Sequence, residues 1–312
     1  MSQEKTDRAY DVIIVGGGPA GLSAAIYASR DRVNTLLIEK GLIGGMINEA
    51  EQVDNFPGFP EGISGMELAS KKYQQAQKYG IKDVNAEVTG IEVRDNHNFV
   101  LKTTDGEYFA RAVIIAGGSQ KLKMDVPGEK EFLGRGVSYC ATCDAPFYTG
   151  KIVAVVGGGN SALYEAMHMA KFVSKVYIIH RRDQLRATPV VQERAREEPK
   201  IEFLLNTVVE AVEGGDSVEK LRLKNVVTGQ QSELKCDGVF VSIGLKPNTE
   251  YLHGLLTLDD FGMIMVNDRM ETNVPGIFAA GDIRHNSIRQ TIAAAGDGAV
   301  AAVNAKKWVD EG

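Results

Sequence analysis

The hydrophobic pattern of the chain alternates between short apolar runs and longer stretches with helical spacing. Short uninterrupted apolar runs are typical of parallel strands that are buried on both faces. Glycine-rich turns follow several of these runs directly, and helical patterns then begin. The alternation predicts an α/β fold with parallel sheets. The runs of this kind cover residues 11–15, 35–38, 112–116, 152–156, 176–179 and 238–242.

Several other segments carry weaker signals of secondary structure. Residues 66–79 have the spacing of an amphipathic helix, and residues 88–102 indicate a strand pair around Asp95-Asn96. Thr188-Pro189 predicts a helix start, because proline fits the first helical position. A run of small residues predicts a further helix over 291–302. Three more segments are strand-like, namely residues 201–205, 208–212 and 221–226.

The first apolar run leads into a glycine-rich turn of the kind that binds a pyrophosphate. Residues 16–21 give Gly-x-Gly-x-x-Gly between a strand and a helix, which is the context that this motif requires. The first glycine permits a tight turn, the second lets the backbone approach the pyrophosphate, and the third lets helix and strand pack closely. The next strand ends at Glu39, an acid that accepts hydrogen bonds from a ribose diol and repels a 2′-phosphate. An ordinary turn with an exposed glutamate is the alternative. The expected contacts are Gly16, Gly18, Pro19, Ala20, Gly21 and Glu39.

The same pattern repeats in the middle of the chain. Residues 157–162 give Gly-x-Gly-x-x-Ala, and His180 stands as far beyond Gly157 as Glu39 stands beyond Gly16. A basic cluster here replaces the acid, which suits the 2′-phosphate of NADP rather than NAD. A solvated run of charges is the alternative. The expected contacts are Gly157, Gly159, Asn160, Ser161, Ala162, His180, Arg181, Arg182 and Arg186.

A Cys-x-x-Cys motif, Cys140 to Cys143, lies between the two turns and is followed at once by Asp144. Two cysteines at this spacing can form a short, reducible disulfide, and a nearby charge or helix start tunes their ionisation. The motif is also half of a zinc site, but zinc needs two more ligands. The third cysteine, Cys236, is alone, and no two histidines stand at ligand spacing. We therefore expect a redox disulfide and no metal, with an inert pair as the other alternative. Cys236 is expected to be a small buried hydrophobe.

A third candidate site lies near the C-terminus. A strand that ends at Gly281-Asp282 places a carboxylate where ligand hydroxyls can reach it, and the glycine lets the backbone come close. Arg289, Gln290 and Thr291 open the small-residue helix, whose positive N-terminus could face an electron-rich ring edge. A simple strand and turn is the alternative.

Length, charge and hydropathy restrict the class of protein. The 312 residues can form two domains, and the hydrophobic fraction of 44% is ordinary for a globular protein. A net charge of −6 makes a nucleic-acid partner unexpected. No apolar run is long enough to span a membrane, and the N-terminus lacks an apolar signal core. We expect a cytoplasmic protein, in which a Cys-x-x-Cys pair is catalytic rather than structural.

Taken together, these motifs resemble the low-molecular-weight bacterial and archaeal thioredoxin reductases over essentially the whole chain. The segments that carry the resemblance are residues 16–21, 55–58, 136–144, 157–162, 180–186, 279–282 and 289–290. The resemblance implies two Rossmann-like, three-layer domains that bind FAD and NADPH, with the second domain inserted in the first. The FAD domain would comprise residues 1–119 and 247–312, and the NADPH domain residues 120–246. The resemblance also adds Gly45 and Asn55 to the cofactor contacts.

The implied activity is the transfer of electrons from NADPH through FAD and the Cys140–Cys143 disulfide to oxidised thioredoxin. By the family pattern, Cys143 would be the thiol nearest the flavin and Cys140 the thiol that attacks thioredoxin. Asp144 would protonate a leaving thiolate, with a helix cap as the alternative. A homodimer is also implied. Because the cysteine pair and the NADPH site share one inserted segment, a domain rotation between two states is expected.

Other functions remain open from the sequence. A flavoprotein partner of a peroxiredoxin, a reductase of a glutaredoxin-like protein, and a redox-sensing nucleotide-binding module are the alternatives. The chain also departs from the family pattern at Met46, Gly117, Tyr164 and Leu245. We expect these departures to affect the flavin potential and the rate rather than the class of reaction.

Overall fold

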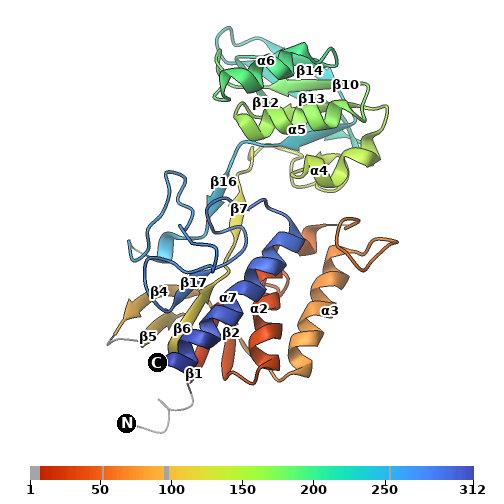
Figure 1. Cartoon of the computed structure of the whole chain (residues 1–312). Helices are drawn as coiled ribbons and strands as arrows, with labels where there is room; N and C mark the ends of the chain where they lie inside the picture. The colour runs from red at the N-terminus through yellow and green to blue at the C-terminus, as the bar shows by residue number, and fades with distance from the viewer. Residues whose placement is uncertain (1–7, 51–52, 95–97, 253) are drawn as a thin grey trace. The chain divides into compact units, whose positions relative to one another are not determined.

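The computed structural model describes residues 8–50, 53–94, 98–252 and 254–312. The chain divides into two compact units (Figure 1). Unit 1 comprises the chain up to Gln120 and from Lys246 onward, and unit 2 comprises Lys121 to Leu245. Unit 2 is therefore inserted in the sequence of unit 1. The expected α/β class, with parallel sheets in both units, is confirmed.

Unit 1 is built on one mixed sheet with the strand order β3-β2-β1-β6-β5-β4, in which β17 also pairs with β6. Strands β3, β2, β1, β6 and β17 pair in parallel, whereas β5 runs antiparallel to both β4 and β6. The elements are β1 (Ala9–Val15), α2 (Pro19–Arg30), β2 (Thr35–Glu39), the 3₁₀ helix η1 (Gly45–Glu49), α3 (Gly65–Lys78), β3 (Lys82–Asn85), β4 (Val88–Val93), β5 (Phe99–Thr103), β6 (Gly106–Ile115), the 3₁₀ helix η3 (Glu250–Leu252), β17 (Ile277–Ala279) and α7 (Thr291–Glu311).

Unit 2 has a parallel sheet with the order β11-β10-β9-β15-β8 and an antiparallel sheet with the order β12-β13-β14. One hydrophobic cluster joins the parallel sheet to its helices, and another includes buried residues of both sheets. The unit is therefore a helix–sheet–sheet sandwich. Its elements are β8 (Val137–Ser138), α4 (Ala141–Asp144), the 3₁₀ helix η2 (Ala145–Tyr148), β9 (Ile152–Val156), α5 (Asn160–Ala170), β10 (Lys175–Ile179), α6 (Pro189–Glu197), β11 (Ile201–Leu204), β12 (Thr207–Gly214), β13 (Val218–Asn225), β14 (Gln231–Lys235) and β15 (Gly238–Val241).

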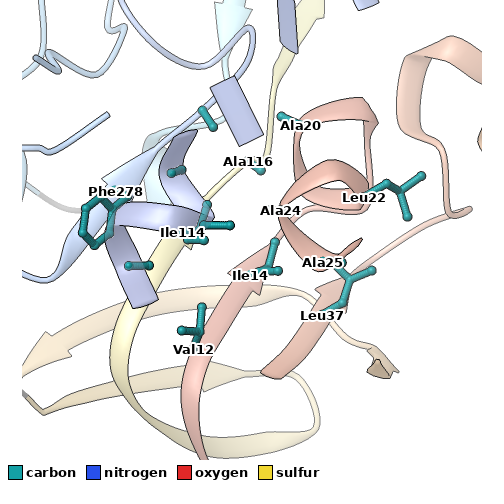
Figure 2. Packing of buried hydrophobic residues seen from close by; sticks show 14 of the residues in the cluster. Val12, Ile14, Ala20, Leu22, Ala24, Ala25, Leu37, Ile114, Ala116 and Phe278 are labelled. Atoms are coloured by element: carbon teal, nitrogen blue, oxygen red, sulfur yellow. The ribbon is translucent and has the colours of Figure 1, made fainter. Parts of the chain in front are cut away.

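The buried strands send successive side chains to opposite faces of the sheet. In β1, Val12 and Ile14 pack with helices α2 and α7, whereas Ile13 and Val15 belong to the cluster on the other face. Figure 2 shows Val12 and Ile14 beside Ile114 of β6 and the alanines of α2. This two-sided burial explains why the strands read as continuous apolar runs.

Helices α2 and α7 pack closely because α7 carries a glycine at the contact (Figure 1). A Cβ atom on Gly298 would lie 2.0 Å from the carbonyl oxygen of Ala20. The first turn of α2 therefore rests directly on α7. The end of α7 is fixed as well, because the indole Nε1 of Trp308 donates to the Arg111 carbonyl at 3.0 Å. These contacts hold the glycine-rich turn of unit 1 against the rest of that unit.

Most of the expected elements are confirmed, but some boundaries were wrong. Helix α7 continues to Glu311 rather than ending near residue 302, and β6 begins at Gly106, six residues before the predicted run. Contacts with distant segments stabilise both extensions, since Phe109 of β6 pairs with Ala9 of β1 and Trp308 of α7 donates to the Arg111 carbonyl. Strands β3 and β14 were not expected, because their residues are mostly exposed and polar. The predicted Asp95-Asn96 turn lies outside the described residues.

The two segments that cross between the units pair with each other as β7 (Ser119–Lys121) and β16 (Leu245–Pro247). The Leu122 N–H also donates to the Gly244 carbonyl at 3.1 Å. In the described part of the chain, none of the helices has the length and apolar character needed to cross a membrane.

Candidate nucleotide-binding turns and redox disulfide

The glycine-rich turn of unit 1 contains two glycines that the chain itself requires. Gly16 has a φ of +105°, and a Cβ atom there would lie 2.5 Å from the Ala116 carbonyl oxygen. A Cβ atom on Gly21 would lie 1.8 Å from the Gly16 carbonyl oxygen. Larger residues at these two positions would force strand, turn and helix apart. Their predicted roles in turn formation and packing therefore agree with the structure.

Gly18 is different, because nothing within the described chain requires a glycine there. Its φ is −74°, which any residue adopts, and a Cβ atom would lie 3.9 Å from the nearest atom, the Gly44 carbonyl oxygen. A group outside the chain that approaches the bare backbone would explain the glycine. Gly18 is also the N-cap of α2 and provides no side-chain cap. The free N–H groups of Ala20 and Gly21 in the first turn of α2, together with the helix dipole, therefore form a cradle that fits a pyrophosphate.

Glu39 lies at the end of β2, and backbone N–H groups hold its carboxylate. Oε2 accepts from the Gly17 N–H at 2.6 Å, and Oε1 accepts from the Gly41 N–H at 2.8 Å. Each oxygen of a carboxylate can accept more than one hydrogen bond, so both retain capacity for ribose hydroxyls. The expected ribose acid therefore stands beside the pyrophosphate cradle in a fixed orientation.

Two expected cofactor contacts from distant parts of the sequence come together in unit 1. The side-chain amide Nδ2 of Asn55 donates to Oε1 of Gln290 at 3.0 Å. Gln290 is the N-cap of α7, which begins at Thr291, and Arg289 beside it is exposed with a φ of +57°. The loop at residues 54–60 lines an open surface hollow of about 360 Å³. Gly45 lies close to the glycine-rich turn of unit 1. A Cβ atom on Gly45 would lie 3.3 Å from the Cα atom of Gly18.

The loop that carries Gly281 and Asp282 is held by a buried ion pair that the sequence did not reveal. Arg284 donates to Asp297 of α7 through Nε at 2.7 Å and through a terminal guanidinium nitrogen at 2.9 Å. The Gly281 N–H donates to the same carboxylate at 3.1 Å, and Asp282 accepts from the Ser287 hydroxyl at 2.9 Å. In the sequence, Asp297 is visible only as a single acid in a helix of small residues. That pattern does not indicate that Arg284 is its partner.

The second turn, in unit 2, repeats the geometry of the first. Gly157 has a φ of +154°, and a Cβ atom there would lie 2.3 Å from the Ser242 carbonyl oxygen. Gly159 has a φ of −93°, and a Cβ atom there would contact nothing within 4 Å. The second glycine again leaves space for an external phosphate. Helix α5 begins at Asn160, whose Oδ1 accepts from the Thr188 N–H at 2.8 Å, and Ser161 and Ala162 follow in its first turn.

The basic segment after β10 folds back onto the same turn. The N–H groups of Arg186 and Ala187 donate to the Gly158 carbonyl at 2.7 and 3.0 Å. Arg181, Arg182 and Arg186 are exposed. None of the ion pairs within the described ranges includes any of the three. The structure thus brings three uncompensated guanidinium groups to the rim of the second turn.

His180 lies differently from the other basic residues of this segment. The residue is 6% exposed, and a Cβ atom on Gly158 would lie 2.3 Å from its Nδ1, so the ring packs under the turn. Nε2 lies 3.1 Å from the Gln184 carbonyl oxygen. Burial lowers the pKa of His180, and the neighbouring arginines act in the same direction. His180 therefore packs beneath the turn, and its predicted contact with the cofactor stays a prediction.

The Cys140–Cys143 pair is a disulfide in the structure, with the two Cα atoms 5.3 Å apart. Cys140 is the N-cap of the short helix α4 and is half-buried, whereas Cys143 within this helix is exposed. Among the described residues, no three His, Cys, Asp or Glu side chains gather as a metal site requires. Cys236 is buried, as expected, and burial raises its pKa to about 12, which keeps this thiol protonated.

Ser138 connects the first cysteine to the acid that follows the second. Its hydroxyl donates to Asp144 Oδ2 at 2.6 Å and accepts from the Cys140 N–H at 3.0 Å. Ser138 is buried in β8, so this orientation is fixed. Sequence reasoning missed this role, although the serine two residues before the motif was visible.

A second hydrogen-bond network holds the residue between Ser138 and the disulfide. The Tyr139 hydroxyl donates to Glu129 Oε1 at 2.7 Å, and the Lys121 ammonium donates to the Tyr139 carbonyl at 2.9 Å. Glu129 is buried and also accepts from the N–H groups of Met124 and Asp125. The segment that follows β7 is thus tied to the redox motif, and no local pattern in the sequence indicated this link.

Comparisons with known proteins agree with this site. The family described as pyridine nucleotide-disulphide oxidoreductase matches residues 10–298. Thioredoxin reductase of Bacillus subtilis (strain 168) is 49% identical, over 100% of this chain and 97% of its own length. The crystal structure of thioredoxin reductase from Streptococcus pyogenes MGAS5005 is 40% identical and superposes with a TM-score of 0.93, over 98% of this chain and 99% of that one.

A third relative has a sequence identity close to that of the Streptococcus pyogenes protein but superposes less closely. The Lactococcus lactis thioredoxin reductase, solved in the FR conformation, is 42% identical over 97% of this chain and 99% of its own, with a TM-score of 0.66. The extent of these matches covers both glycine turns and the disulfide. The chain belongs to the thioredoxin reductase family of the pyridine nucleotide-disulphide oxidoreductases.

Proposed function

We propose that the protein is an NADPH-dependent thioredoxin-disulfide reductase that uses FAD. The observation that carries the proposal is the combination, in one chain, of two glycine-rich cradles with a Cys140–Cys143 disulfide. Beside the first cradle, strand β2 ends at the acid Glu39. Three exposed arginines lie at the rim of the second cradle. Two nucleotides of different charge and one redox-active disulfide are the parts that this reaction needs.

Unit 1 is the proposed FAD site. The bare backbone at Gly18 and the first turn of α2 would hold the pyrophosphate, and Glu39 would accept from the adenosine ribose. Asn55, Asp282 and Gln290 would contact the flavin half. When bound, FAD takes a hydride from NADPH and passes two electrons to the disulfide.

Unit 2 is the proposed NADPH site. Gly159 and the start of α5 would hold the pyrophosphate, and the guanidinium groups of Arg181, Arg182 and Arg186 would bind the 2′-phosphate. His180 would act as a support that sets the position of Gly158 and, through it, of Arg186. Because the 2′-phosphate is the difference between NADPH and NADH, these arginines would set the cofactor preference.

The cysteines and Asp144 would carry out the disulfide exchange. With the pair reduced, the Cys140 thiolate attacks the thioredoxin disulfide and forms a mixed disulfide, and one thioredoxin sulfur leaves. Cys143 then attacks Cys140, which re-forms the Cys140–Cys143 disulfide and releases thioredoxin with two thiols. Asp144 would supply a proton to a leaving thiolate, and the Ser138 hydroxyl would hold its carboxyl beside the pair.

A rotation between the two units is part of the proposal. The cysteine pair and the proposed NADPH site belong to the same unit, and both must use one flavin. Relatives of nearly equal identity superpose on this chain with TM-scores of 0.93 and 0.66, which supports more than one conformation in the family. Undiminished turnover by a protein whose two units are cross-linked would contradict the rotation.

A homodimer and a cytoplasmic location also stay proposals. Exposed apolar side chains on the packed helices α2 and α7 support a dimer, namely Tyr27, Ile292, Val300 and Val303. The last three share one face of α7 by their helical spacing. A monomer in sedimentation at micromolar concentration would contradict the dimer.

The cytoplasmic location rests on the redox role of the disulfide, and it would be contradicted if the protein were found only outside the cytoplasm.

Turnover with thioredoxin tests the proposed function. We expect continuous oxidation of NADPH when oxidised thioredoxin is in excess, followed at 340 nm. Cys140→Ser and Cys143→Ser should each lower the rate at least about a hundredfold, because neither variant can re-form the disulfide. Cys236→Ala is the matched control and should retain turnover, since this thiol is buried and its raised pKa keeps it protonated. Oxidation of NADPH that stops after a single reduction would instead identify a redox sensor.

The cofactor preference tests the role of the basic cluster. The double variant Arg181→Ala/Arg182→Ala should lower kcat/KM for NADPH about a hundredfold or more, because two charge-assisted contacts with the 2′-phosphate are lost. The value for NADH should change by less than about threefold. Arg194→Ala on α6 removes an exposed arginine of the same unit and serves as the control. Equal losses for both cofactors would refute the assignment.

A further inference from the structure

Helix α3 carries a lysine in the stripe that faces the interior of unit 1. The buried positions of this helix follow helical spacing, and they are Gly65, Leu68, Ala69, Lys72 and Ala76. Lys72 keeps only 9% of its surface exposed. A lysine at such a position is unusual, because an ammonium group loses its hydration when it is buried.

The chain itself compensates this charge poorly. The Lys72 ammonium makes one long hydrogen bond, 3.5 Å to the Pro19 carbonyl oxygen, and lies 5.0 Å from the centre of the Phe56 ring. Within the described ranges, none of the ion pairs includes Lys72. Burial lowers its pKa to about 8. An ammonium group has three N–H donors, so most of its capacity is unused by the protein.

The position of this ammonium group is informative. Pro19 is the first residue of α2 and directly follows Gly18, the glycine that the chain does not require. Phe56 follows Asn55, the residue that contacts Gln290. Lys72 therefore stands where the pyrophosphate cradle and the loop at residues 54–60 meet α3. An anion bound in the cradle would provide the missing counter-charge.

We propose that Lys72 binds FAD, with its ammonium group paired to the pyrophosphate at the start of α2. The inference rests on the proposed function of unit 1 as the FAD site. The N–H groups of the first turn of α2 supply only partial positive charge, whereas a diphosphate carries full negative charges. Lys72 would complete the neutralisation from the side of α3, and the Phe56 ring would cover the lysine stem and ammonium group.

The inference predicts opposite effects on the empty protein and on cofactor binding. Without FAD, Lys72 is a buried charge with little compensation, so its removal should leave the stability unchanged or raise it. With FAD, its removal takes a counter-charge from the pyrophosphate. A lysine that only fills space would behave differently, because methionine of similar length and volume would replace it without loss of affinity.

The test compares Lys72→Met with Lys71→Met on protein from which the flavin has been removed. Lys71 is the matched control, since it lies on the same helix, is exposed and pairs with Glu67 at 3.2 Å. FAD and ADP are titrated separately, by quenching of flavin fluorescence and by calorimetry. ADP carries the diphosphate without the flavin. The thermal midpoint of the empty protein is measured in parallel.

We expect Lys72→Met to weaken the binding of FAD and of ADP by about ten- to a hundredfold, with an unchanged or higher thermal midpoint. Lys71→Met should change both affinities by less than about twofold. Lys72→Arg keeps the charge and should retain affinity within about fivefold, which protects the test if the methionine variant folds poorly.

Three results would overturn the inference. Unchanged affinities in Lys72→Met would show that the lysine has a structural role only. Weaker binding of FAD with unchanged binding of ADP would move the contact from the pyrophosphate to the flavin half. Failure of the unaltered protein to bind FAD would overturn the proposed function, and this inference with it.

Discussion

The close backbone contact at the two strand–turn–helix junctions is the constraint on which both units depend. At Gly16 and at Gly157, a Cβ atom would lie 2.5 and 2.3 Å from the carbonyl oxygen that follows the neighbouring strand. Each turn is therefore pressed against its sheet and cannot move independently of it. The helix that follows is held with its first N–H groups exposed to a ligand. Gly18 and Gly159 leave space at these helix starts, which is consistent with the two dinucleotides proposed for this chain.

Charge then distinguishes what the two units can bind. In unit 1, backbone N–H groups fix Glu39 beside the cradle, whereas in unit 2 the folded-back basic segment presents three exposed arginines. The buried charges of unit 1 differ in whether the chain itself supplies an opposite charge. Arg284 and Asp297 neutralise each other and hold the Gly281–Asp282 loop, so this pair is complete without a ligand. Lys72 has no such partner among the described ion pairs, and this difference makes it a candidate for contact with an anionic cofactor.

Local patterns predicted the parts of the fold that local sequence determines. The apolar runs, the glycine turns and the helix that begins at Pro189 after Thr188 are confirmed, because each depends on residues close in the chain. Contacts between distant segments could not be predicted. The burial of His180 depends on a turn that lies more than 20 residues before it, and the Asn55–Gln290 pair joins the two sequence segments that form unit 1. Polar strands such as β14 were also not predicted. β14 has no apolar pattern of its own, and its strand conformation depends on pairing with β13.

The central claim is that electrons pass from NADPH through FAD to the Cys140–Cys143 disulfide. An anaerobic titration with NADPH, following flavin absorbance and free thiols together, tests it most directly. The account predicts uptake of about two NADPH per chain, one for the flavin and one for the disulfide, with two new thiols that are absent in Cys140→Ser. A Cys236→Ala background removes the third cysteine from the thiol count. Bleaching of the flavin without new thiols would contradict the account, because the disulfide would then lie off the electron path.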